Sequence, residues 1–318
     1  MKQQSLEASG FEKYRKKTRK EIFLEEMNRI IPWVELSKAI SPYYPKERTG
    51  AGRKPIGLER MLRIHFLQHW FELSDPGAEE ALYDSRAMRR FVGIDLGKEP
   101  VPDETTLCKF RHLMERHNLG DELFRLVNVY LEDNGLSVNR GTIVDATIIP
   151  APTSTKNKKR QRDPSMHSVK KGNQWYFGMK AHVGVDSKTK LIHSVVVTPA
   201  NVHDSQVVGD LLQGDETRVW GDSAYSGQSE AIKAVAPNAK DFTQRKGSRY
   251  RQLTDRERSA NRTKSKVRAK VEHVFGLMKR RLGYTTVRYR GLNKNAHAVF
   301  TKCALINIVM AKRQLLAF

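Results

Sequence analysis

The stretch Thr142-Ile-Val-Asp-Ala-Thr-Ile-Ile149 decides how the second half of this chain folds. Every residue in it except Asp145 and Ala146 is β-branched, which is typical of a strand buried on both faces. A carboxylate inside such a strand is costly to bury unless it is paired or binds a cation. Asp145 is therefore a candidate functional residue, although structural carboxylates near strand ends are common.

The residues after this strand alternate between strand and helix patterns. Segments 180–185 and 191–198 read as two strands joined by the polar turn 186–190, which predicts a hairpin. We then expect a helix, a short strand, a helix, a last strand and two final helices, at about 204–212, 218–221, 228–235, 240–243, 263–282 and 293–316. This order is that of an RNase H-like α/β domain, in which helices flank a mixed sheet.

The chain carries a large and unevenly distributed positive charge. Its 318 residues include 57 Lys+Arg against 35 Asp+Glu, a formal net charge of +22. Residues 244–290 hold sixteen basic and three acidic residues, and residues 153–180 hold eight basic and one acidic. Clustered basic residues indicate a polyanionic partner, because each phosphate that they neutralise releases counterions. We therefore expect this protein to contact nucleic acid.

The residues before the deciding strand read as helical. Apolar residues in segment 58–71 recur close to the helical period, and residues such as Gly93 and Asp103 delimit further short helices at 74–83, 85–92 and 103–117. Short helices joined by tight turns fit a helix-turn-helix-like arrangement, and an ordinary helical bundle explains them equally well. We expect an all-α domain over residues 1–135, for DNA binding or dimerisation. A catalytic domain would follow over residues 136–318, with basic insertions near 151–177 and 244–262.

Composition and hydropathy argue against several functional classes. Two cysteines, Cys108 and Cys303, do not suggest a disulfide framework or a cysteine-built zinc site. The first twenty residues are polar and basic, unlike a signal peptide. The apolar segment 296–311 is interrupted by Lys302 and is too short to span a bilayer. We expect a cytoplasmic protein that makes no membrane contact.

Two further acids accompany Asp145. Asp222 directly follows a predicted strand, and taken singly it reads as a turn or helix cap. Glu272 lies within a predicted helix, four residues after Arg268 and seven before Lys279, so these three would share one helical face. Taken singly, Glu272 reads as half of a solvated ion pair. Three acids placed on two strands and one helix are nonetheless what a site for two Mg²⁺ ions requires.

Ordered motifs resemble a known family. They are Ile143-Val-Asp-Ala-Thr147, Trp175-Tyr-Phe-Gly-Met-Lys-Ala-His-Val-Gly-Val-Asp186, Thr198-Pro-Ala-Asn-Val-His-Asp204 and Gly221-Asp-Ser-Ala-Tyr225. Together with the N-terminal segments 74–93 and 101–106, they resemble the DDE transposases of bacterial insertion sequences, in the group of families four and five. That group has a signature of Tyr, two residues, Arg, three residues, Glu, six residues and Lys. Arg268, Glu272 and Lys279 fall on these spacings, whereas Ser265 stands at the tyrosine position.

The resemblance implies a DNA transposase that cleaves DNA at the ends of its mobile element and transfers the 3′ hydroxyl ends into target DNA. Asp145, Asp222 and Glu272 would be the catalytic residues and would bind two Mg²⁺ ions, with Mn²⁺ as a substitute. Arg268 and Lys279 would hold DNA phosphate near the scissile bond. The partner would be double-stranded DNA, both element ends and target. We expect a homodimer on this DNA, associated with the nucleoid in the bacterial cytoplasm.

The basic segments supply further candidate contacts to DNA phosphates, which position a duplex without reading its sequence. These candidates are Lys158, Lys159, Arg160, Arg256, Arg258, Arg262, Lys264, Arg280 and Arg281.

Two other functions stay open. An RNase H-like nuclease would cleave DNA without joining ends, and an inactive or domesticated DNA-binding protein derived from a transposase would do neither. The intact set of three acids argues against the inactive protein. Asp186 is expected in the hairpin turn and Asp204 as a helix cap, and either could instead support the site by hydrogen bonds to its ligands. His182 and His203 are expected to be structural, as lone histidines more often are.

Overall fold

The computed structural model describes residues 16–46, 54–136, 141–248 and 250–317, and most of the polar first twenty residues lie outside it. The chain divides into two compact units. One comprises Met1–His117 with Lys312–Phe318, and the other comprises Asn118–Ala311. Helix α7 (Leu119–Asp133) thus belongs to the second unit, although it precedes residue 135, where the sequence suggested a domain boundary.

The described part of the first unit is helical, and the four helices predicted for it from the sequence are confirmed. Each of α4, α5 and α6 begins after a side chain, Ser74, Ser85 or Asp103, that accepts a hydrogen bond from the backbone N–H three residues on. Aromatic rings form much of its core. The helices are α1 (Arg19–Ile30), α2 (Trp33–Ile40), α3 (Leu58–Phe71), α4 (Asp75–Asp84), α5 (Arg86–Val92) and α6 (Glu104–Arg116).

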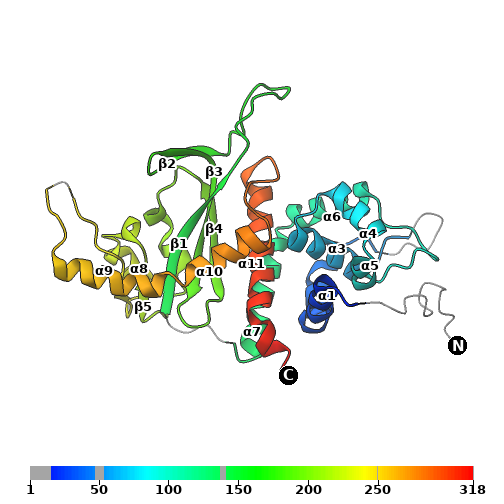
Figure 1. The fold of residues 1–318 in the computed structure, drawn as a ribbon, viewed down its shortest axis with the longest axis horizontal. Helices are drawn as coiled ribbons and strands as arrows, with labels where there is room; N and C mark the ends of the chain where they lie inside the picture. The colour runs from blue at the N-terminus through cyan, green and yellow to red at the C-terminus, as the bar shows by residue number, and fades with distance from the viewer. Residues whose placement is uncertain (1–15, 47–53, 137–140, 249, 318) are drawn as a thin grey trace. The chain divides into compact units, whose positions relative to one another are not determined.

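A mixed sheet forms the centre of the second unit (Figure 1). It runs in the order β2-β3-β1-β5-β6, and β4 also pairs with β3. Strand β1 is antiparallel to β3 and parallel to β5, which in turn is parallel to β6. The strands are β1 (Gly141–Pro150), β2 (His167–Lys171), β3 (Gln174–Asp186), β4 (Ile192–Pro199), β5 (Arg218–Trp220) and β6 (Lys240–Asp241).

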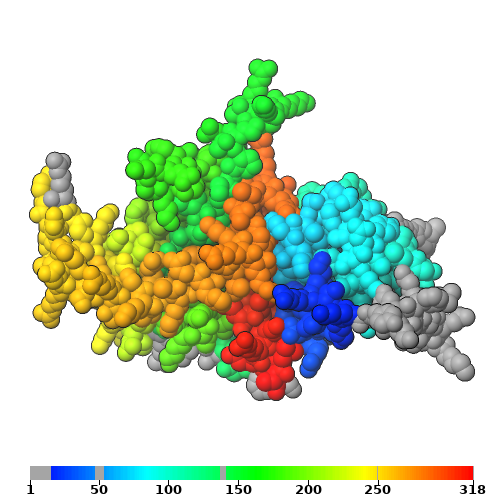
Figure 2. Space-filling model, viewed as in Figure 1, coloured from blue at the N-terminus to red at the C-terminus, as the bar shows by residue number. Residues whose placement is uncertain are grey.

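The structure confirms the deciding strand and the hairpin after it, and adds a strand that the sequence did not predict. Strand β2 and the first residues of β3 form a second hairpin, within the region that was expected to be a basic insertion. Most side chains of β2 are exposed and polar, so that this strand has no apolar alternation by which to recognise it. The chain between β1 and β2 projects from the surface of its unit, as Figures 1 and 2 show.

Helices α9 (Asp255–Arg268) and α10 (Val271–Gly276) cross one face of the sheet, and α8 (Ser229–Val235) and α11 (Leu292–Leu315) complete the unit (Figure 1). The single helix expected at about 263–282 is therefore wrong. The chain breaks at residues 269–270 and then winds into a π-helical turn, Leu277–Arg281. At the break, Lys270 Nζ donates a hydrogen bond to the Ser187 carbonyl at 2.6 Å, and Arg268 reaches β1. These tertiary contacts override the local helical pattern.

The segment 204–212 is helical, as expected, but it does not form one continuous helix. Two short 3₁₀ turns, Asp204–Val207 and Gly209–Leu211, take its place. Their apolar residues pack with Val144 and Val219 in one buried cluster beneath the sheet's parallel edge. Among the described residues, none of the helices has the length and apolarity that crossing a membrane requires.

Candidate active site

Asp145 and Asp222 lie on neighbouring parallel strands. Strand β1 pairs with β5 in a register that aligns Ile143 with Trp220. Extending this register by two residues places Asp145 beside Asp222, which immediately follows the end of β5 and Gly221. Strand pairing therefore directs two acids separated by 77 positions in the sequence to the same edge of the sheet, where both line one cleft.

Each aspartate has one carboxylate oxygen fixed by the backbone. Asp145 Oδ1 accepts a hydrogen bond from the Ala146 N–H at 2.8 Å. Asp222 Oδ1 accepts one from the Ala224 N–H at 2.8 Å, and so caps the short 3₁₀ turn Ser223–Tyr225. Asp222 therefore caps this turn, as its sequence position predicted, and is still a candidate site residue.

Arg268 ties the third acid to the first. It is the last residue of α9, and its Nη1 lies 2.6 Å from Asp145 Oδ2. Its Nη2 lies 3.8 Å from Oε1 of Glu272, in the first turn of α10. Arg268, Glu272 and Lys279 all face one cleft, as their spacing predicted. They do not belong to one continuous helix, because α9 ends between the first two.

Burial dominates the protonation of Asp145. The residue is 8% exposed, and burial raises the pKa of its carboxyl to about 6, against the opposing effect of the Arg268 guanidinium. The negative charge of Asp222 raises this pKa further. The carboxylate of Asp145 is thus held in its charged form by a neighbouring cation, and a metal ion would serve the same purpose.

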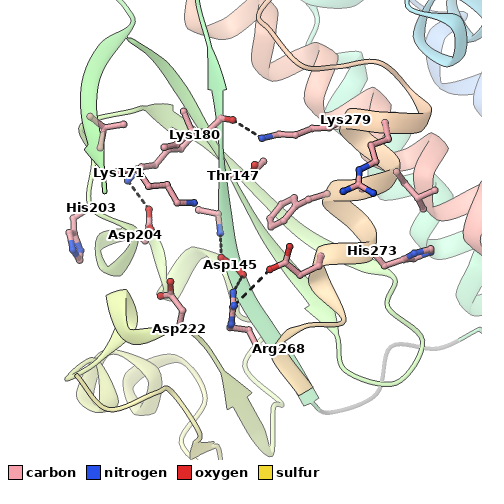
Figure 3. Close-up of a pocket in the computed structure, with 18 of the residues that line it drawn as sticks. Asp145, Thr147, Lys171, Lys180, His203, Asp204, Asp222, Arg268, His273 and Lys279 are labelled. Carbon is pink, nitrogen blue, oxygen red and sulfur yellow. Dashed lines mark hydrogen bonds and ion pairs between the residues drawn. The ribbon is translucent and has the colours of Figure 1, made fainter. Parts of the chain in front are cut away.

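The three acids line one cleft of about 1060 Å³, together with several basic side chains (Figure 3). Lys279 Nζ donates to the Ile148 carbonyl of β1 at 3.0 Å, and burial lowers the pKa of this lysine. The basic side chains that line the cleft are Lys170, Lys171, Lys180, Arg268, Lys279 and Arg280. An acidic centre within a basic rim can attract a polyanion and bind cations at the same place.

Three of these cleft lysines had not been singled out from the sequence. Lys170 and Lys171 reach the cleft on β2, the strand that the sequence pattern did not reveal. Lys180 is buried in β3, and its Nζ donates to Asp204 Oδ1 and to the Val202 carbonyl, both at 2.8 Å. The sequence could have marked Lys180 as a candidate site residue, because it is a lysine within an otherwise apolar strand.

The competing acids and histidines take different places. Asp186 lies in the hairpin turn, as expected, where its carboxylate accepts from the N–H groups of residues 188 and 189. Asp204 is not a helix cap, because His203 occupies that position and the Asp204 carboxylate turns to Lys180 at the cleft. His182 is buried, and burial lowers its pKa to about 4, so its neutral ring pairs with Thr198.

The remaining candidate DNA contacts lie on three elements. Lys158, Lys159 and Arg160 are exposed on the projecting chain between β1 and β2, and Arg280 and Arg281 are exposed on the π-helical turn. Arg256 and Arg262 are exposed on α9.

Two other basic residues of α9 have partners within the protein. Arg258 lies 3.5 Å from the Asp255 carboxylate and donates to the Leu253 carbonyl, while Lys264 donates to the Thr243 carbonyl at 2.7 Å. Ser265, at the signature's tyrosine position, accepts a hydrogen bond from Gln244 at 2.6 Å.

The cleft acids have the chemistry of a magnesium site. Over the described ranges of the chain, no three His, Cys, Asp or Glu side chains lie close enough together to chelate one ion. Mg²⁺ does not require such a cage, because it keeps several waters and is bound by one or two carboxylates together with substrate phosphates. Asp145 and Asp222 would supply these carboxylates, and Asp145 already pairs with one positive charge, the Arg268 guanidinium. The residues therefore fit the metal.

Comparison with known proteins identifies the family. A solved structure titled "Cryo-EM structure of piggyBac transposase synaptic complex with hairpin DNA" aligns over 93% of this chain and 75% of its own, at 10% identity and a TM-score of 0.47. A family model described as a transposase domain (DUF772) matches residues 12–113. A second, described as a transposase DDE domain, matches residues 137–308, more than half of the chain. The mixed sheet following an all-α region is accordingly the RNase H-like architecture expected, and this chain belongs to the DDE transposase family.

Proposed function

We propose that this protein cleaves DNA at the ends of its mobile element and transfers the 3′ hydroxyl ends into target DNA, in the manner of the insertion-sequence families four and five. The observation that carries this proposal is the cleft that Asp145, Asp222 and Glu272 line together with several basic side chains. Family membership gives the reaction class, and the cleft supplies acids and bases in suitable places for phosphodiester chemistry.

The two aspartates and the glutamate would hold Mg²⁺, or Mn²⁺ in its place. When bound, a pair of such ions activates the attacking oxygen and stabilises the leaving oxygen. Asp145 and Asp222 would provide the rigid part of the site, because β1 and β5 fix their backbones and each already has one oxygen bonded to a backbone N–H. Glu272 has an exposed side chain and would complete the site from α10.

The basic side chains would hold the DNA backbone across the cleft. Lys170 and Lys171 approach from β2, and Lys279 and Arg280 approach from the π-helical turn. Arg268 would exchange its carboxylate partner for a phosphate as the cations bind, since its guanidinium suits both anions. The exposed Arg256 and Arg262 of α9 would extend this path beyond the cleft.

The reaction requires two element ends in one complex, so a homodimer on DNA forms part of the proposal. The N-terminal helices would contribute DNA binding or dimerisation, and the protein would act in the cytoplasm, at the nucleoid. We also propose that residues 1–135 act as the helical domain and that residues 136–318 act as the catalytic domain.

Replacing Asp145 tests whether the cleft performs chemistry or only binds DNA. We expect Asp145→Ala to abolish Mg²⁺-dependent cleavage of a duplex carrying an element end, because one metal-binding carboxylate is lost. Its affinity for the same duplex, measured by fluorescence anisotropy in EDTA, should stay within about twofold of wild type, since phosphate contacts dominate affinity. Asp210→Ala removes an exposed acid from the same unit and should cleave normally. Retained cleavage by Asp145→Ala would exclude this site.

A further inference from the structure

The hairpin of β2 and β3 carries an exposed tryptophan. Its strands pair so that Trp175 stands opposite Lys170, and Phe177 stands opposite Ser168. Trp175 is 67% exposed, whereas the other three tryptophans of the chain are at most 9% exposed. The Trp175 ring therefore contributes little to the core, and its surroundings indicate what it can bind.

The exposed ring belongs to a face that combines flat groups with positive charge. Residues directly opposite each other in an antiparallel pair share one face, so Trp175, Lys170 and Phe177 lie on the same side of the hairpin. The Arg162 guanidinium, from the projecting chain between β1 and β2, lies over the Phe177 ring, 5.3 Å from its centroid. We refer to these four side chains as the stacking face. Aromatic rings and cations alternate along it.

The stacking face leads toward the acids of the cleft. Side chains of a strand alternate between its two faces, and the registers of β3 with β2 and with β1 are continuous through Gly178. The side of β3 that carries Trp175 therefore also carries Val183, which pairs with Asp145. Lys170 itself lines the cleft. A DNA strand with a phosphate in the cleft can thus run on to this face along the same side of the sheet.

The chemistry of the stacking face favours unpaired bases. Cations alone suit the phosphates of paired and unpaired DNA alike. Aromatic rings and arginine guanidinium planes instead stack on bases that have left the duplex, and they accept any sequence because every base has a π-face. The surrounding charge suits the same partner, since segment 153–180 holds eight basic residues and one acidic residue.

We propose that the stacking face binds single-stranded DNA that leaves the cleft, with an unpaired base stacked on Trp175 and a flanking phosphate held by Lys170. This inference rests on the proposed function, because it requires the DNA to pass through the same cleft. It goes beyond the phosphate contacts of that function, which do not distinguish paired from unpaired DNA. The stacking face would give the protein a preference for DNA whose bases are unpaired beside the cleaved bond.

Binding of two single-stranded oligonucleotides to the full-length protein tests the role of the ring. One is an oligothymidine, and the other is an abasic strand of the same length, which keeps the phosphates and lacks the bases. Fluorescence anisotropy in EDTA should show that wild type binds the oligothymidine about tenfold more tightly, as expected for one stacked base. Trp175→Ala should lose most of this preference and keep its affinity for the abasic strand, since the phosphate contacts remain.

Two matched variants separate the ring from the charge. Trp175→Phe keeps a ring that can stack, and it should retain most of the preference for the oligothymidine. Lys170→Gln keeps Trp175 and removes one charge, so it should weaken the binding of both strands equally. Because the other three tryptophans are buried, the oligothymidine should quench the intrinsic fluorescence of wild type and not that of Trp175→Phe.

Each other outcome overturns a defined claim. If wild type binds both strands equally, or if Trp175→Ala keeps the full preference, the stacking role is wrong and the proposed function stands. The same follows if Trp175→Phe falls as low as Trp175→Ala, because the base then does not contact a ring. If wild type binds a duplex carrying an element end but neither oligonucleotide, the stacking face does not bind single-stranded DNA. If wild type binds none of the three, the proposed function fails and the inference fails with it.

Discussion

Asp145 combines the two properties that a metal-binding carboxylate needs, a fixed position and an unsatisfied charge. The pairing of β1 with β3 and β5 fixes its backbone, and the Ala146 N–H fixes one oxygen. Burial disfavours its charge, and the Arg268 guanidinium and the Ala146 N–H offset this effect only in part, so that the pKa stays raised. In the proposed function, a divalent cation would compete with Arg268 for the same carboxylate.

The raised pKa of Asp145 predicts a pH dependence of stability in metal-free protein. The folded pKa is about 6 and the unfolded value about 3.9. Because the folded state holds this proton more tightly, the stability contributed by Asp145 is fully present below pH 4 and is lost as pH rises through about 6. Urea unfolding of wild type and Asp145→Asn in EDTA should therefore show a difference in unfolding free energy that shifts against wild type by about 2 kcal/mol between pH 4 and pH 7.

The comparison with Asp145→Asn removes the contributions of all other titrating groups, because they are common to both proteins. A difference in unfolding free energy that stays constant over this range would mean that the pKa of Asp145 is not raised.

At the residue scale, the sequence identified the acids but not the contacts that organise them. Asp145 stood out because a charge interrupts a β-branched strand, and Glu272 because of its spacing from Arg268 and Lys279. The ion pair between Arg268 and Asp145 joins positions 123 residues apart, and no local pattern encodes it.

At the scale of elements, the break between α9 and α10 shapes the site. At this break, Lys270 donates to the Ser187 carbonyl, and the preceding Arg268 pairs with Asp145. Arg268 and Glu272 remain neighbours across the break. The apolar residues that predicted a single helix are buried as expected, since Val271, Val274 and Met278 are fully buried. They lie on α10 and the π-helical turn and not on one continuous helix.

Helix α9 begins earlier than the sequence pattern indicated, at a capping box in which Thr254 and Glu257 exchange hydrogen bonds. The helix is strongly polar, so hydrophobic periodicity gave no signal for its first two turns. Glu257 also pairs with Arg245 and Arg251 at 2.6 and 2.7 Å, which ties the preceding loop to the helix. The basic segment thus presents its charges from an ordered element.

The exposed arginines of α9 predict a specific change in salt dependence. Arg256→Gln with Arg262→Gln should reduce the slope of log affinity against log salt concentration by about 2, one phosphate contact for each arginine. Lys188→Gln with Lys233→Gln removes the same charge from exposed positions on other elements and should leave the slope unchanged. Filter binding from 50 to 300 mM KCl measures both. Equal slopes for wild type and the α9 double variant would remove this helix from the DNA path.

At the scale of the whole molecule, the net charge of +22 and the acidic cleft suit the same task, in which a polyanion is attracted to a place that can also bind cations. Basic side chains from β2, β3, α9 and the π-helical turn surround or approach the three acids. Charge composition predicted the polyanionic partner, and strand order predicted the RNase H-like sheet. Neither could predict that β2 would carry Lys170 and Lys171 to the cleft, because this requires the pairing of an exposed polar strand.

The most direct test of the central claim is a combined strand-cleavage and joining assay. It uses labelled duplex with the element's ends, target DNA and Mg²⁺, and compares wild type with Glu272→Gln. Glu230→Gln makes the same chemical change at an exposed residue of α8 and serves as the control. We predict Mg²⁺-dependent nicking at the ends followed by joining in wild type and Glu230→Gln, with a loss of both steps of at least about 100-fold in Glu272→Gln. Cleavage without joining would indicate a nuclease, and undiminished cleavage and joining by Glu272→Gln would contradict the assignment of this cleft as the active site.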